Sequence, residues 1–271
     1  MWELLPAVAL SQICSLLDSA TLVLASEVSP VWRYCISSER YWRSFYYDCS
    51  AVNNLVRKHH RGYDWDVYHR RLVAFIADYA HCIRVVVVRD VDSLADVETV
   101  AQLAECCHAL SCFEVSAAEA TLRGARLREL QSSLWEVCAR NAGLTRVSVR
   151  NVNLTREPCL NRLQVFSIFG PGQAQRLVEL EVVTPSDGER DARCPRHVPA
   201  LSMSSLKNLA QLRRVTTTPH DVDISTVRHL AGRSLRHVVL LCREQELERV
   251  SESRQVAAMR ECVDVSFLLV I

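Results

Sequence analysis

The chain has 271 residues, of which 32 are basic and 31 acidic, and its net charge is +1. This length allows one large core or two domains, because domains typically run to about 100–200 residues. The balanced charge argues against a nucleic-acid-binding protein, which usually carries a strong basic excess. No apolar run approaches the roughly 18 residues of a membrane-spanning helix. We therefore expect a soluble protein with no nucleic-acid or membrane partner.

The first 46 residues carry an apolar pattern broken by helix start and stop signals. Pro6 suits the first turn of a helix, and the following apolar series breaks at Asp18, Ser19 and Thr21, which offer N-cap oxygens to a second helix. Pro30 either ends that helix or starts a third, which Trp42 and Phe45 are expected to close. The two apolar series are Leu5, Ala9, Ile13, Leu16 and Leu17, then Leu22, Ala25, Val28 and Val31.

This N-terminal stretch is not typical of a secretory signal, because no Lys or Arg precedes Arg33 and polar residues interrupt the apolar run. About forty residues cannot bury this much apolar surface on themselves. Either the rest of the chain or a partner protein must cover it.

In sequence order, this stretch resembles an F-box. The family's pattern is Leu-Pro, an apolar helix, a polar break, and later Val and Trp-Arg. The matching residues over about 2–46 are Leu5, Pro6, Leu10, Ile13, Leu17, Leu22, Ala25, Val28, Trp32, Arg33 and Trp42. The resemblance implies a Skp-type adaptor as partner, contacted or braced by Leu5, Pro6, Ile13, Leu17, Leu22, Val28 and Trp32.

A Leu-x-x-Leu-x-Leu register recurs seven times along the rest of the chain, at intervals of 23 to 35 residues. Its instances are Cys82/Val85/Val87, Leu110/Phe113/Val115, Leu144/Val147/Val149, Leu177/Leu180/Val182, Leu212/Val215/Thr217, Leu235/Val238/Leu240 and Cys262/Val265/Phe267. Each instance predicts a short strand. Segments with helical periodicity lie between them, such as residues 93–110 and 125–143, where Gly143 is a candidate C′ residue.

Strand–helix units of this kind resemble the irregular leucine-rich repeats of F-box proteins. The predicted fold class is therefore α/β, with a three-helix F-box at residues 1–46, a helical linker at 47–77 and a leucine-rich-repeat solenoid at 78–271. A doubly wound sheet is the competing α/β fold, but no Gly-rich phosphate loop follows any predicted strand.

The twelve cysteines are scattered along the chain, and we interpret them as structural thiols, with Cys14, Cys82, Cys106 and Cys262 at apolar positions. Neither the Cys194-x-x-His197 pair nor the Cys106–His108 run completes a set of about four zinc ligands. We predict no metal and no cofactor. The basic histidine-containing segments around His59 and His69 are read as a solvated face, with contact to an acidic partner as the alternative.

Period-two alternation predicts which strand residues point away from the core and line a concave face. As substrate-contacting residues we name Glu114, Arg146, Arg150, Glu179, Glu181 and Arg214, while noting that charged strand residues can be merely solvated. The loop 184–199, the largest insertion, is a further candidate for recognition.

The family resemblance implies a non-catalytic substrate-recognition subunit of a Skp–cullin–F-box ubiquitin ligase. It implies a cullin partner reached through the adaptor, a protein substrate on the repeats, and action in the cytoplasm or nucleus. No nucleophile elbow, phosphate loop or zinc-protease helix points to an enzyme. The alternative hypothesis is a free-standing leucine-rich-repeat scaffold or inhibitor whose N-terminal helices cap the first repeat.

Overall fold

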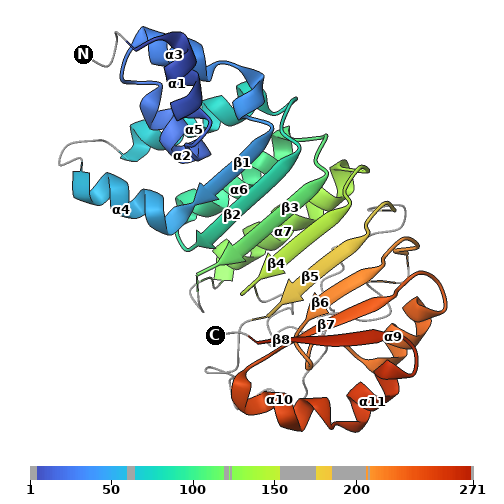
Figure 1. The fold of residues 1–271 in the computed structure, drawn as a ribbon. Helices are drawn as coiled ribbons and strands as arrows, with labels where there is room; N and C mark the ends of the chain where they lie inside the picture. The colour runs from blue at the N-terminus through green and yellow to red at the C-terminus, as the bar shows by residue number, and fades with distance from the viewer. Residues whose placement is uncertain are drawn as a thin grey trace.

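A computed structural model of the chain describes residues 5–59, 65–118, 122, 124–152, 175–184, 206 and 208–269. Within these residues the fold is α/β, as predicted, with ten α-helices and one open sheet of eight parallel strands (Figure 1). The strand order follows the chain from β1 to β8 without a reversal, and every neighbouring pair is parallel. The described sheet is therefore not doubly wound, because a doubly wound sheet reverses its strand order at a switch point.

The N-terminal segment forms three short helices, as predicted, but it also contributes the first strand of the sheet. Its elements are α1 (Ala7–Cys14), α2 (Ser19–Ala25), α3 (Pro30–Ile36), a 3-10 helix (Glu39–Tyr41) and β1 (Ser44–Asp48). Asp18 caps α2 by accepting a hydrogen bond from the Thr21 amide at 2.7 Å, and Pro30 is the first residue of α3.

The expectation that Phe45 closes a third helix is wrong, because Phe45 lies in β1. Trp42, Phe45 and Tyr47 are all buried and have the same spacing as the seven predicted strand motifs. They form an eighth instance of that register. The predicted boundary at residue 46 consequently falls inside a strand of the sheet.

The remaining elements alternate between strands and helices. They are α4 (Cys49–His59), α5 (Trp65–Tyr79), β2 (Val85–Val91), α6 (Leu94–Cys106), β3 (Cys112–Ala117), α7 (Gly124–Arg140), β4 (Arg146–Arg150), β5 (Glu179–Val183), β6 (Arg214–Thr217), α9 (Ile224–Ala231), β7 (His237–Cys242), α10 (Glu244–Ser251), α11 (Arg254–Arg260) and β8 (Asp264–Leu269). Helices α6 and α7 lie side by side behind the sheet in the view of Figure 1. The predicted loop 184–199 lies outside the described residues except for Thr184.

The predicted strand register is confirmed for β3, β4, β5, β6 and β7, but it is wrong by one residue for β2. Val86 and Val88 pair with Phe113 and Val115 in the core, whereas Val85 and Val87 face the other way. Four consecutive valines have no alternation, so the sequence alone cannot say which pair points inward. In the last unit Cys262 is exposed, and its neighbour Val263 is buried instead.

A buried asparagine, not Gly143, ends α7. Asn141 donates from its side chain to the carbonyls of Cys107 (2.9 Å) and Val137 (3.0 Å), and its Oδ1 accepts from the Leu110 amide at 2.8 Å. These bonds join the end of α7 to the segment between α6 and β3. The sequence pattern points to Gly143 because glycine is the usual signal for a helix end, whereas the role of Asn141 depends on contacts distant in sequence.

An aromatic stack joins the N-terminal helices to the sheet and α5. The Trp42 ring lies 5.0 Å from both the Phe75 and Tyr79 rings, measured between centroids, and its indole N–H donates to the Ile36 carbonyl at 2.9 Å. Tyr79 also donates its hydroxyl to the Ser37 carbonyl at 3.2 Å. One continuous hydrophobic core consequently runs from Leu10 to Val263.

We predict that Trp42→Ala lowers the free energy of unfolding by about 3–5 kcal/mol, because it leaves a cavity between Phe75 and Tyr79. Trp135→Ala, at a position that is 45% exposed on α7, is the matched control and should cost less than about 1 kcal/mol. Denaturant unfolding of both variants measures the difference. Equal losses would show that the stack contributes no special stability.

The ten described cysteines are unbonded thiols, and six of them are buried. The structural-thiol interpretation holds for Cys14 and Cys82, whereas Cys106 is only partly buried and Cys262 is exposed. Burial raises the pKa of the Cys138 thiol to about 12 and, together with Cys106 and Cys82, that of Cys107 to about 12. These two thiols remain protonated and inert at neutral pH, because the thiolate is the reactive form.

We predict that iodoacetamide at pH 8 alkylates Cys262 in the native protein but reaches Cys138 and Cys107 only after unfolding. The raised pKa values also make the free energy of unfolding depend on pH, because the thiols ionise at a lower pH in the unfolded chain than in the folded protein. Their contribution is present below about pH 9 and is lost as the pH rises toward 12. Peptide mass spectrometry and alkaline unfolding measure the two effects, and fast native labelling of Cys138 would contradict the burial.

Candidate protein-interaction surfaces

The N-terminal helices and the turns between them expose large apolar side chains. Among the described residues, ten large hydrophobic side chains are exposed, and five of them belong to this segment, at 42% to 85% exposure. We call these five the N-terminal apolar surface: Val8, Leu16, Val28, Val31 and Tyr34. Helices α1 and α3, which carry three of them, pack against each other (Figure 1). Exposed apolar side chains on two neighbouring helices make this segment a candidate protein-interaction site.

The burial of one side of the helices explains why Val31 and Tyr34 of α3 point outward. Leu10, Cys14, Leu22 and Ile36 are buried in the common core, and they fix the inward face of each helix. Ser29 accepts a hydrogen bond from the Trp32 amide at 3.4 Å and so sets the start of α3. Val31 and Tyr34 then face away from the core, since they are one and two residues away from the inward-facing Trp32 and Ile36.

Most of the predicted adaptor residues are not exposed in the described structure. Leu22 and Trp32 are buried, and Leu5, Ile13 and Leu17 are partly buried against the core. Pro6 and Val28 are exposed. The five buried or partly buried residues consequently hold the helices against the core. The exposed apolar residues are their neighbours in sequence. The three-residue spacing of Val28, Val31 and Tyr34 is the sequence signal that could have identified this second face.

The second candidate surface is the face of the sheet opposite the apolar core. We call it the charged face, and it carries Glu114, Arg146, Arg150, Glu179, Glu181, Arg214, His237 and Asp264. The strand register brings these residues together, since Arg146, Glu179, Arg214, His237 and Asp264 follow one another across five adjacent strands. All six residues predicted to contact substrate lie on this face.

Five of those six residues pair with one another. Arg146 lies 3.2 Å from Glu114 and 3.8 Å from Glu179, measured between side-chain nitrogen and oxygen. Arg150 lies 2.7 Å from Glu181, whose other oxygen accepts a hydrogen bond from Ser148 at 2.8 Å. Arg214 lies beside Glu179 in the register. The charges of the face therefore neutralise one another locally, and a partner must compete with these pairs.

The Cys112 thiol on the charged face is protonated at neutral pH. Cys112 is partly buried beside Glu114, and burial together with that carboxylate raises its pKa to about 11. Within the described parts of the chain, no three His, Cys, Asp or Glu side chains gather closely enough to hold a metal ion. Cys194 and His197 lie outside those parts.

We compared the chain with known proteins. No protein-family model matches the sequence, and no curated protein matches it significantly. Within the described residues, no helix has both the length and the apolar character needed to cross a membrane.

We predict a coupling free energy of about 1 kcal/mol between Arg150 and Glu181, because the Glu181 carboxylate is largely buried and its partners hold it in place. A double-mutant cycle with Arg150→Ala and Glu181→Ala measures it. The pair Glu136–Arg140 on α7, whose carboxylate side chain is 34% exposed, is the control and should give less than about 0.5 kcal/mol. The same coupling in both pairs would show that burial of Glu181 has no effect.

Proposed function

We propose that this protein is an F-box leucine-rich-repeat protein that recruits substrates to a Skp–cullin–F-box ubiquitin ligase. In this proposal the N-terminal apolar surface binds a Skp-type adaptor, through which the cullin is reached. The observation that carries it is the exposure of five large apolar side chains on α1, α3 and the turns that follow α1 and α2, ahead of the sheet. The F-box-like order of residues 5–33 supports the same assignment.

The arrangement of the sheet supports the leucine-rich-repeat part of the proposal. Leucine-rich repeats stack one strand per repeat beside the preceding one, and all strands run in the same direction. The strand order from β1 to β8, all parallel, has this property. Each repeat would expose its apolar side if isolated, so the stack shares one core, and the core of this chain is continuous.

In this proposal the charged face binds a protein substrate and holds it near the ubiquitin-charged enzyme. The chain then contributes proximity and orientation, and other subunits perform the chemistry. Its ion pairs favour a substrate with both positive and negative side chains, which can exchange partners with Arg146 and Glu179. The assembly would act in the cytoplasm or the nucleus.

A second candidate function is a free-standing scaffold or inhibitor whose helices only cap the sheet. A specific contact favours it, because Ser19 at the start of α2 accepts a hydrogen bond from the Tyr46 amide of β1 at 2.9 Å. Helix α2 thereby covers an edge strand that would otherwise be open to another chain. Capping and adaptor binding use opposite sides of the helices, so the two functions predict different effects of surface substitutions.

We predict that Leu16→Asp combined with Val28→Asp lowers the affinity for a Skp-type adaptor at least 100-fold and abolishes co-elution with it. The melting temperature of the double variant should be nearly unchanged. Both side chains are more than half exposed, so the charges are placed in the interface and not in the core. Leu94→Asp, at a 48% exposed position on α6, is the control and should bind normally.

Size-exclusion chromatography and isothermal calorimetry with the purified adaptor make this measurement. A wild-type chain that stays monomeric and ignores the adaptor would favour the scaffold. A double variant that binds as well as wild type would exclude the N-terminal apolar surface as the adaptor site.

A further inference from the structure

The two edges of the sheet differ in what covers them. At β1 the edge is covered by α2, because the Tyr46 amide donates to the Ser19 hydroxyl at 2.9 Å. At the opposite end lies β8 (Figure 1), and within the described residues no strand pairs with its outer edge. The sequence of β8 contains no Pro or Lys, residues that commonly protect an open edge from pairing with other chains.

Three residues of β8 direct their backbone groups to this open edge. In a parallel sheet the N–H and C=O of one residue bond to the same neighbouring strand, and successive residues alternate between the two neighbours. The Asp264 amide donates to the Arg236 carbonyl at the start of β7 at 2.9 Å, so the backbone of Asp264 faces β7. Every second residue after Asp264 also faces β7, and the residues between them face outward. We call these outward residues the edge residues: Val265, Phe267 and Leu269.

The side chains of the edge residues are only partly covered. Their partners in the register of β7 are at most 1% exposed: Val238, Leu240 and Cys242. In β8, by contrast, Leu269 is 48% exposed, and Val265 and Phe267 are only partly buried against the core. The guanidinium carbon of Arg260, on α11, lies 5.5 Å from the centroid of the Phe267 ring. The row of inward-facing apolar side chains therefore reaches this edge without a neighbour beyond it.

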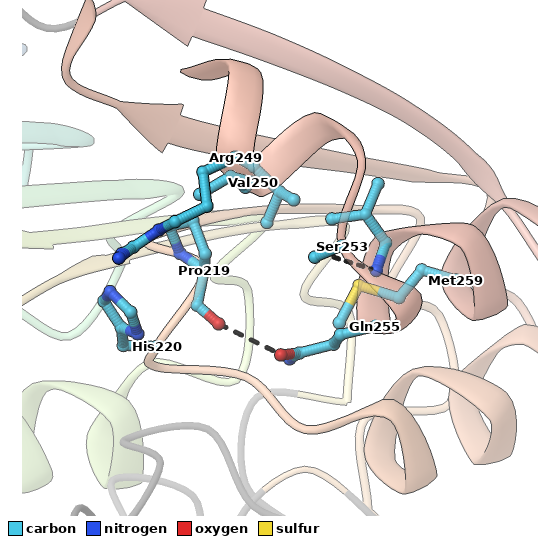
Figure 2. Close-up of a pocket in the computed structure, with 9 residues that line it drawn as sticks. Pro219, His220, Arg249, Val250, Ser253, Gln255 and Met259 are labelled. Carbon is cyan, nitrogen blue, oxygen red and sulfur yellow. Dashed lines mark hydrogen bonds between the residues drawn. The ribbon is translucent and has the colours of Figure 1, made fainter. Parts of the chain in front are cut away.

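The helix before β8 is held in place by hydrogen bonds. Helix α11 packs against β8 and α9. Figure 2 shows Gln255 of α11 donating from Nε2 to the Pro219 carbonyl, at 3.4 Å, and Ser253 accepting from the Val256 amide, at 3.2 Å. Gln255 also donates to the Val222 carbonyl at 2.8 Å. These bonds join α11 to the loop after β6, so the open edge is formed before a partner arrives, and pairing costs little conformational entropy.

We propose that the open edge of β8 pairs, in antiparallel orientation, with β8 of a second copy of this chain about a two-fold axis at Phe267. In this register Phe267 lies opposite the same residue of the second copy, and Val265 lies opposite Leu269. Every edge residue then donates and accepts a hydrogen bond across the interface, and the inward apolar rows of the two sheets become continuous. A shift by two residues leaves an edge residue unpaired, and a shift by one places inward side chains opposite outward ones.

Charge and edge coverage both favour a second copy in this orientation. Asp264 is the only charged residue of β8, and antiparallel pairing places the two Asp264 residues at opposite ends of the paired strands, about 20 Å apart. Parallel addition of β8 to β1 of another copy is blocked, because α2 covers that edge. Two open edges joined about a two-fold axis give a closed dimer and not a filament. The N-terminal apolar surface lies at the other end of the sheet, so the proposal is independent of the proposed function.

Sedimentation velocity of the 271-residue chain between about 1 and 200 μM tests the dimer. We expect a monomer–dimer equilibrium with a dissociation constant of about 20 μM, since one pair of short strands buries less than the roughly 1,200 Å² of a standard interface. Leu16→Asp with Val28→Asp, on the N-terminal apolar surface, should dimerise like wild type. A chain that remains monomeric at about 200 μM would overturn the proposal.

Two lysine substitutions at adjacent positions test whether the edge is the interface. Leu269→Lys places a charge in the inward apolar row opposite Val265, and it should weaken the dimer at least tenfold. Leu268→Lys, at a 55% exposed position on the other face of the strand, is the matched control and should change the dissociation constant less than about threefold. Equal effects of the two substitutions on dimerisation would show that the copies associate through another surface.

A second pair of variants tests the register and changes only the exposed positions Ser266 and Leu268, which lie opposite each other across the proposed interface. Ser266→Lys with Leu268→Glu places each lysine opposite a glutamate, so its dissociation constant should stay within about threefold of wild type. Ser266→Lys with Leu268→Lys places lysine opposite lysine and should dimerise at least fivefold more weakly. Equal dissociation constants for these two double variants would contradict the antiparallel register about Phe267.

Discussion

The stacking of Trp42 on Phe75 and Tyr79 is the contact on which the arrangement of this molecule depends. Trp42 lies between the N-terminal helices and β1, so its position fixes where the helices end and where β1 begins. Because the stacked rings belong to the N-terminal segment and to α5, the helices cannot reorient without exposing large aromatic surfaces. Tyr79 and the ion pair between Arg71 and Glu27 add polar contacts across the same junction.

The junction leaves the N-terminal segment buried on one side and exposed on the other. The apolar pattern of residues 5–31 raises the choice between coverage by a partner and coverage by the chain itself, and the structure shows that the chain covers only part of this surface. One side of each helix is buried in a core shared with the sheet, while Tyr34 on α3 and Leu16 and Val28 in the turns after α1 and α2 are exposed. A module with these two sides can cap the sheet and present an interface at the same time. A truncation at residue 46 would remove half of β1 together with Trp42, so surface substitutions are the better way to separate the roles.

The charged face follows from the parallel register. Each strand begins after a similar turn, so equivalent positions line up, and residues 23 to 35 apart in sequence become neighbours across the sheet. Arginine and glutamate alternate along the row Arg146, Glu179 and Arg214. Charges of one sign therefore do not lie next to each other in this row. The pairing supplies little stability where the side chains are half exposed, as for Arg146, and more where Glu181 is buried beside Ser148. A partner that approaches this face meets a mixed-charge surface with its own internal bonds.

The amino-acid sequence by itself determined the α/β class, the three N-terminal helices, five of the strand registers and the location of all six charged residues on one face. These features depend on periodicity within a few residues, where an alternating strand or a capped helix has one stable orientation. Only the tertiary structure decided which valine pair of β2 points inward, that Phe45 lies in a strand, that Asn141 ends α7, and that Leu22 and Trp32 are buried. Each of these depends on a neighbour distant in sequence, since burial and strand pairing are properties of the packed core and not of the local segment.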